Sequence, residues 1–218
     1  MAAIEGMIPF LIYFETGVRD DKISNRELYE MARAKGIAND PDDSGGATLV
    51  GVTHTTFKQY LKGKPEVMMN SPEENETDKD KNSQNMDPTM ERFKKLPYSG
   101  WLDILKSMFW DKWQADEIRS QSVAEMLVDW VWTSGRYGIT IPQRLLGVKT
   151  DGIVGPKTLT AVNGKDAEAL FRQLKTERLA YIERICAGRP ANKKFRKGWI
   201  RRINAVGTIL NSTFASES

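Results

Sequence analysis

The chain has 218 residues, a formal net charge of +3 and one cysteine. This length suits one large domain or two small ones and is enough to bury a core. A single cysteine, Cys186, excludes an internal disulfide and a cysteine-cluster metal site, and it lies in a pattern typical of a core helix. The chain has one histidine, His54, so a histidine-rich metal site is excluded. A Ser-His or Cys-His pair is possible only if His54 is its catalytic base.

The sequence contains no signal for membrane insertion or cleavage. No apolar run approaches the roughly 20 residues of a membrane span. The N-terminus has no basic region before its short apolar segment, which contains Pro9 and ends in Glu15. We therefore expect a protein made in the cytoplasm without a signal peptide and with no stable membrane insertion.

Helix signals are strong along the chain and strand signals are weak, which predicts an all-α protein. Ser24 with Glu27 makes a capping box ahead of a helix that Gly36 ends, and Ser122 with Glu125 makes a second ahead of a helix that Gly135 ends. The other predicted helices are 54–62, 100–113, 142–147, 156–163, 167–187 and 198–211, with Pro142 and Pro156 each in a first turn.

The first apolar segment ends in a glutamate. Ile8, Leu11 and Glu15 fall on one face of a predicted helix that Gly17 stops. Burial on this face and the negative end of the helix dipole would both favour the protonated carboxyl group, which a general acid requires. The alternative is that Glu15 emerges at a helix end and is solvated.

Charge is distributed unevenly. Residues 66–91 hold eight Asp or Glu against two Lys, and this polar stretch is expected to be a mobile insertion. Residues 171–204 hold eleven Lys or Arg against two Glu, a basic field that could attract nucleic acid or an anionic cell wall. A solvated helix face explains the basic residues equally simply.

The loop at 38–53, ANDPDDSGGATLVGVT, gathers three aspartates and several glycines. It is either a structural turn or a substrate-facing loop that supplies a second carboxylate. Thr53 is a candidate for the N-cap of the following helix.

These residues together resemble glycoside hydrolase family 108, the lysozyme-like N-acetylmuramidases of phages and prophages, some of which are called secretion activator proteins. The family typically has Glu-Gly-Gly at the end of an apolar helix, then Asn-Asp-Pro, a Gly-Gly-x-Thr turn and Gly-Ile-Thr. Glu15 matches its catalytic glutamate, residues 39–41 match its Asn-Asp-Pro, and residues 51–53 match its Gly-Ile-Thr.

The second half of the chain is similar to the type 3 peptidoglycan-binding region that accompanies this family. The similar stretches are MFWDKWQADEIRSQSVAEMLVDWVWTSG, IPQRLLGV, DGIVGPKTLTAVN and GWIRRI. The resemblance implies a lysozyme-like catalytic region at 1–98, interrupted by inserts at 18–37 and 63–95, and a helical peptidoglycan-binding region at 99–218 packed with it as one unit.

Two features depart from the family pattern. Glu-Gly-Gly has become Glu-Thr-Gly, and the first insert separates Glu15 from Asp40 by 25 positions where the family usually has about six. The Ser24 capping box predicts that this insert is an extra helix, and a helical hairpin could return Asp40 to Glu15.

The resemblance implies cleavage of the β-1,4 bond between N-acetylmuramic acid and N-acetylglucosamine in bacterial peptidoglycan, with no metal or cofactor. Glu15 would be the general acid, and Asp40, or else Asp42 or Asp43, would stabilise the cation or activate water. Thr53 would help to hold that water. Further candidates for substrate contact are Asp43, Gly45 and Gly46 in the loop and the aromatic rings of Trp132 and Tyr137. Four other tryptophans, Trp101, Trp110, Trp113 and Trp130, could also stack on sugars, although most of these six aromatic residues are expected in the core.

Three other functions remain open from the sequence. The changed Glu-Thr-Gly and the insert would suit a non-catalytic wall-binding or phage structural protein. A lytic transglycosylase could use the same glutamate. A nucleic-acid binder would use the basic C-terminal helices, although we expect no nucleic-acid partner. Without a signal peptide, a phage lysin would reach the wall after cell release or through a holin.

Overall fold

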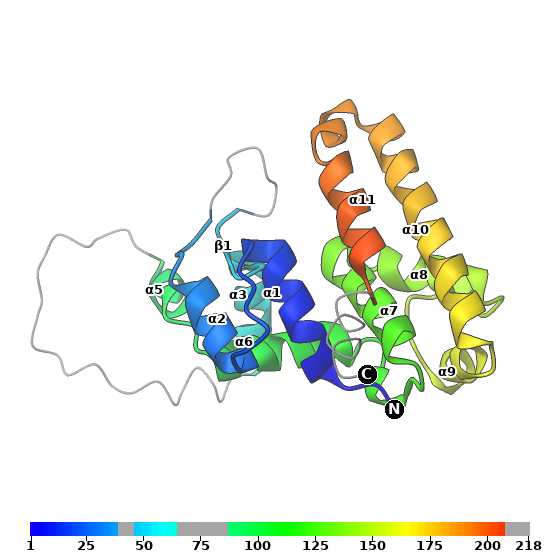
Figure 1. Ribbon diagram of the computed structural model, residues 1–218, viewed down its shortest axis with the longest axis horizontal. Helices are drawn as coiled ribbons and strands as arrows, with labels where there is room; N and C mark the ends of the chain where they lie inside the picture. The colour runs from blue at the N-terminus through cyan, green and yellow to red at the C-terminus, as the bar shows by residue number, and fades with distance from the viewer. Residues whose placement is uncertain (39–45, 65–86, 208–218) are drawn as a thin grey trace, which may run out of the picture. The chain divides into compact units, whose positions relative to one another are not determined.

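The computed structural model describes residues 1–38, 46–64 and 87–207 (Figure 1). In this part of the chain every regular element is helical except two short strands, β1 (Thr48–Leu49) and β2 (Val52–Thr53), so the expected all-α, lysozyme-like class is confirmed. The α-helices are α1 (Ile8–Thr16), α2 (Asn25–Arg33), α3 (His54–Gly63), α5 (Pro88–Lys94), α6 (Tyr98–Leu105), α7 (Gln121–Ser134), α8 (Tyr137–Leu145), α9 (Pro156–Asn163), α10 (Ala167–Gly188) and α11 (Arg196–Ala205). Shorter helical turns are η1 (Ile4–Met7), the π-helical η2 (Lys106–Trp110), η3 (Ala115–Glu117) and η4 (Pro190–Lys194).

The chain divides into two compact units. One is Glu15–Ile104, and the other joins Met1–Phe14 to the chain from Leu105 onward. The expected family regions at 1–98 and 99–218, packed together as one unit, stay a prediction.

In the unit Glu15–Ile104, α2 forms as its capping box predicted. The Ser24 side chain accepts a hydrogen bond from the backbone N–H of Glu27, and Glu27 accepts one from the backbone N–H of Ser24 in return. The insert at 18–37 is therefore an extra helix, as expected. Leu28, Tyr29 and Ala32 of α2 are buried, and the Tyr29 hydroxyl donates to the carbonyl of Leu96 over 2.7 Å.

A tight hairpin joins β1 to β2. Its two turn residues, Val50 and Gly51, both have positive φ, 45° and 78°, as a two-residue type I′ turn requires. A β-branched valine rarely adopts this backbone, so surrounding contacts must hold it. The Trp101 indole supplies one by donating to the Val50 carbonyl over 3.0 Å.

The second unit is organised around α7. Every residue from Val123 to Val131 is buried, which is expected of a helix surrounded by others. The predicted capping box of Ser122 and Glu125 is wrong: α7 begins at Gln121, and Ser120 caps it by accepting from the N–H of Val123. The Glu125 side chain is buried instead of reaching back to the helix start.

The helix α8 differs from expectation because it runs through Pro142 instead of starting there. A proline inside a helix leaves the carbonyl four residues earlier without its partner, here that of Gly138. The Trp113 indole donates to this Gly138 carbonyl over 3.2 Å and so replaces the missing bond. The prediction for Pro156 is confirmed, since it lies in the first turn of α9.

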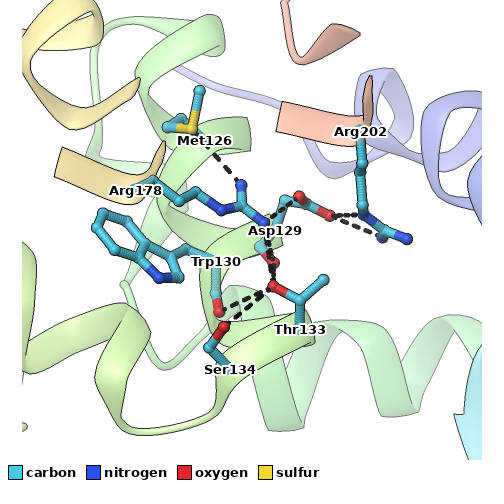
Figure 2. A network of polar contacts seen from close by, with 7 residues as sticks. All are labelled: Met126, Asp129, Trp130, Thr133, Ser134, Arg178 and Arg202. Atoms are coloured by element: carbon cyan, nitrogen blue, oxygen red, sulfur yellow. Dashed lines mark hydrogen bonds and ion pairs between the residues drawn. The ribbon is translucent and has the colours of Figure 1, made fainter. Parts of the chain in front are cut away.

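Helices α10 and α11 lie side by side and run in opposite directions beside α7 (Figure 1). They carry Arg178 and Arg202, whose guanidinium groups meet at the carboxylate of Asp129 in α7 (Figure 2). Asp129 Oδ2 accepts from Arg178 over 2.7 Å, and Oδ1 accepts from Arg202 Nε and Nη2 over 2.9 and 2.7 Å. Burial would raise the pKa of Asp129, but the charges of Arg202 and Arg178 outweigh it and hold that pKa below its usual value.

Two other expectations about helices change. The helix expected at 100–113 begins at Tyr98 and passes into the π-helical η2, which ends at Trp110. The helix expected at 198–211 begins earlier, at Arg196, and ends at Ala205, and residues 208–211 lie outside the described part.

Part of the insert expected at 63–95 is helical. Residues 65–86 lie outside the described part, but residues 88–94 form α5, whose Phe93 is completely buried. The sequence reading missed this helix because its polar residues resemble those of the acidic stretch before it.

None of the described helices has the length and apolar character needed to cross a membrane. No group of three or more His, Cys, Asp or Glu side chains in the described part of the chain could hold a metal ion.

Candidate active site

The proposed general acid, Glu15, lies in the last turn of α1 and is half-buried. Ile8, Leu11 and Ile12 of the same helix are buried, as the apolar spacing predicted. Gly17 follows with a left-handed φ of 72°, so the expected helix stop is confirmed.

The extra helical insert returns to this helix end. Lys35, just beyond α2, donates from Nζ to the carbonyl of Thr16 over 2.8 Å. A lysine there satisfies one of the unpaired carbonyls of the last turn and places a positive charge at the negative end of the helix dipole. The insert therefore contacts the backbone next to Glu15.

Both ends of the Asp-rich loop are fixed. Ala38 and Thr48 exchange two backbone hydrogen bonds of 2.9 and 2.8 Å, and the Thr48 hydroxyl donates to the carbonyl of Gly46 over 3.1 Å. Residues 39–45 lie outside the described part of the chain, and with them the candidates Asp40, Asp42, Asp43 and Gly45. Gly46 is described: it is exposed and has a φ of 67°.

Thr53 lies where the hairpin meets α3 and is the N-cap of that helix. Its Oγ1 accepts from the N–H of Thr56 over 3.0 Å and shares a hydrogen bond of 2.9 Å with the Thr56 hydroxyl. A hydroxyl offers one donor and two acceptor positions, so one position remains beyond these two contacts. The capping role anticipated from the sequence is confirmed, and the role in holding water stays a prediction.

His54 connects α3 to α5. Its Nε2 lies 2.8 Å from Thr89 Oγ1, and Thr89 donates its own proton to Asp87 Oδ1 over 2.7 Å. Because the Thr89 proton is directed to the carboxylate, the imidazole donates to this hydroxyl and does not activate it as a nucleophile. Burial is the main cause that lowers the pKa of His54, helped by the charge of Lys58 and opposed by Asp87.

The two aromatic candidates, Trp132 and Tyr137, belong to the second compact unit. Trp132 is half-buried and lies against Phe109, with ring centroids 4.6 Å apart. Tyr137 is 60% exposed, so its ring is available for contact with a ligand. The expected core positions are confirmed for Trp101, Trp110, Trp113 and Trp130, which are completely buried, and for Cys186, which is buried.

The sequence did not lead us to expect that Glu125 is a buried titratable group. Glu125 is buried in α7, where burial is the main cause that raises its pKa to about 7, with a smaller contribution from Asp129 and a lowering hydrogen bond from Gln121. The S-x-x-E pattern favoured a surface capping role. The uninterrupted apolar residues on both sides of Glu125 were the signal for burial.

Comparisons with known proteins agree with the resemblance. Residues 31–135 match the family model described as Glycosyl hydrolase 108, and residues 137–204 match the model described as Predicted Peptidoglycan domain. Glu15 lies before the first matched region, whereas Thr53 lies within it. The solved structure of Brucella abortus SagA is similar, with a TM-score of 0.60 and 25% identity over 83% of this chain and 89% of that one. No curated protein sequence matches the chain.

Proposed function

Because residues 31–135 match the model described as Glycosyl hydrolase 108, we propose that the chain is an N-acetylmuramidase of this family. It cuts the β-1,4 bond between N-acetylmuramic acid and N-acetylglucosamine in peptidoglycan. The observation that carries the proposal is the order of the two matched regions, a glycosyl hydrolase followed by a peptidoglycan domain. A hydrolase joined to a module for one polymer acts most simply on that polymer.

Glu15 is the proposed general acid. Hydrolysis of a glycoside needs a carboxylic acid that protonates the leaving oxygen while the sugar gains oxocarbenium character. A half-buried carboxyl group in the last turn of a helix, with a left-handed glycine two residues later, is held in place while part of its surface meets solvent. These properties support the assignment of Glu15, which otherwise rests on the Glu-x-Gly resemblance alone.

The second polar group comes from the Asp-rich loop. Asp40 is the proposed base or cation stabiliser, with Asp42 or Asp43 as alternatives. The loop emerges from the Ala38–Thr48 pair, and Thr48 lies five residues before Thr53 on the same hairpin. Within the described residues, the Thr53 hydroxyl has one hydrogen-bonding position beyond its contacts with Thr56, and this position supports a role in holding water.

A lytic transglycosylase is the second candidate. It uses a similar lone glutamate but closes the muramic acid onto itself, which leaves an anhydro end lighter by one water than the reducing end of a hydrolase product. The Asp- and Gly-rich loop favours the hydrolase, because water attack is helped by a second carboxylate across the cleft.

Digestion of purified peptidoglycan tests the proposal. Wild type should release muropeptides with reducing muramic acid ends, and Glu15→Gln should lose this activity by on the order of 10²-fold or more. Glu30→Gln is the matched control, since it removes a carboxylate from the surface of α2, where Glu30 pairs with Arg33. It should digest the wall at the wild-type rate.

Mass spectrometry of the products separates the possibilities. Products lighter by one water would show that the enzyme is a transglycosylase and not a hydrolase. Full activity in Glu15→Gln would remove Glu15 from the mechanism, and sedimentation with the wall without any soluble product would leave a binding protein.

A further inference from the structure

A pocket of about 210 Å³ opens between α7, α10 and α11, entirely within the second compact unit. Its polar lining consists of Thr133, Ser134, Arg178 and Arg202. Its remaining lining consists of Tyr181, Ile182, Ile185, Trp199 and Ile203. The lining therefore combines charged and hydroxyl groups with apolar and aromatic side chains.

Two guanidinium groups belong to the lining of the pocket. Arg178 and Arg202 are almost completely buried and share the single carboxylate of Asp129, so these three side chains hold two positive charges and one negative charge (Figure 2). Arg178 directs Nη2 to Asp129 and to the Thr133 hydroxyl, over 2.7 and 3.0 Å. Its Nη1 meets the Met126 sulfur at 3.5 Å, and a thioether is a weak acceptor.

A carboxylate is the ligand that this arrangement favours. Guanidinium groups bind carboxylates through charge-assisted hydrogen bonds that are about twice as strong as neutral ones. Of the two hydroxyl groups in the lining, that of Thr133 donates to the carbonyl of Asp129, so the Ser134 hydroxyl is the one that can turn to an anion.

The volume limits the size of the ligand. Pockets for drug-sized molecules occupy roughly 300–1,000 Å³, so a pocket of about 210 Å³ suits one or two small amino-acid residues better than a disaccharide. The isoleucines and the half-buried Trp199 offer apolar contact for methyl groups.

We propose that this pocket binds the terminal carboxylate of a peptidoglycan stem peptide, which ends in D-alanine. The C-terminal region then holds the wall by its peptides, while the catalytic region acts on its sugars. This inference rests on the proposed function for the identity of the polymer.

Two peptides test the carboxylate directly on the wild-type protein. Diacetyl-L-lysyl-D-alanyl-D-alanine should bind in isothermal titration calorimetry, and its C-terminal amide should bind about tenfold more weakly or not at all. Equal binding of acid and amide, or no binding of either, would overturn the proposal.

A matched pair of variants locates the binding. Ile185 lines the pocket and is half-buried, so Ile185→Glu adds a negative charge there and Ile185→Gln adds a neutral side chain of the same shape. Binding of the peptide acid should fall about tenfold or more in Ile185→Glu relative to Ile185→Gln. The same pair at Ile153, which is 72% exposed and lies outside the pocket lining, should bind alike. Equal binding by the two Ile185 variants would place the peptide elsewhere.

Two forms of the wall distinguish the carboxylate of the stem peptide from the lactyl carboxylate of the glycan. An amidase removes stem peptides and leaves lactyl carboxylates on the glycan, so Glu15→Gln should sediment with intact wall and lose affinity for amidase-treated wall. Unchanged sedimentation would overturn the proposal in favour of the lactyl group.

Hydrolysis of the peptide-free glycan strands measures the proposed function on its own. If the wild type hydrolyses these strands but Ile185→Glu binds the peptide acid as well as Ile185→Gln does, only the assignment of the pocket is wrong. If the wild type binds the peptide acid but does not hydrolyse these strands, only the proposed muramidase activity is wrong.

Discussion

Arg202 holds Asp129 through two hydrogen bonds from one guanidinium group to one carboxylate oxygen, of 2.9 and 2.7 Å. The carboxylate comes from the centre of α7 and the guanidinium from α11, 73 positions later in the chain. The carboxylate is completely buried, so its charge depends on Arg202 and Arg178 instead of water. This contact links the last described helix to the middle of its unit.

Replacement of Asp129 by asparagine should lower the free energy of unfolding by about 3–5 kcal/mol, because two buried guanidinium groups would lose their counter-charge. Urea denaturation measures the change. As a control, Glu168→Gln removes one partner of the exposed Glu168–Arg172 pair and should cost less than about 1 kcal/mol. A similar small cost for Asp129→Asn would mean that the guanidinium groups find other partners.

Glu125 should make stability depend on pH. The folded protein keeps its proton up to about pH 7, whereas the unfolded chain releases it near 4.5, so the folded state binds more protons in this window and loses stability as the pH rises through it. Glu125→Gln should match wild type at pH 4 and exceed it by about 2–3 kcal/mol at pH 8. Thermal denaturation at both pH values checks this, and an equal difference at both would contradict it.

Gly138 allows α8 to pack closely on α7. A Cβ atom there would lie 2.4 Å from the nitrogen of Val131 and 2.5 Å from the carbonyl carbon of Trp130, and backbone atoms cannot turn aside. Gly138→Ala should therefore cost about 3 kcal/mol or more in urea denaturation. Gly155→Ala is the control: its φ is −129° and no atom lies within 4 Å of the added Cβ, so only its place as the N-cap of α9 is affected, and it should cost less than about 1 kcal/mol.

Two substitutions separate the roles of Thr53. Thr53→Val removes the helix cap and the hydroxyl together, and it should cost about 1 kcal/mol and slow wall digestion. Thr53→Ser keeps the hydroxyl and should retain both properties. Denaturation and muropeptide release measured on the same samples give the answer. A Thr53→Val variant that is less stable but equally active would limit Thr53 to capping.

Local signals predicted the elements that local contacts determine. The Ser24 capping box, the Pro156 turn and the left-handed Gly17 each depend on neighbours within a few positions, and each is confirmed. The same reasoning placed Glu15 at a helix end.

The expectations that were wrong depend on distant residues. Pro142 is tolerated inside α8 because Trp113, 29 positions earlier, satisfies the carbonyl of Gly138. Ser122 fits a capping pattern as well as Ser120 does, so the pattern alone does not choose between the two serines. The pairing of Arg178 and Arg202 with Asp129 likewise has no local signal in the sequence. From the number of basic residues around them, both arginines were expected on a solvated helix face.

The burial of Trp101 has a spectroscopic consequence. The sequence has six tryptophans, and Trp101 is the only one within Glu15–Ile104. Its indole is completely buried and hydrogen-bonded to Val50, so its emission should shift to longer wavelength when the hairpin releases it into water. The difference between the spectra of wild type and Trp101→Phe therefore isolates one fluorophore, which reports on the unit that contains Glu15 while the other five tryptophans report on the rest.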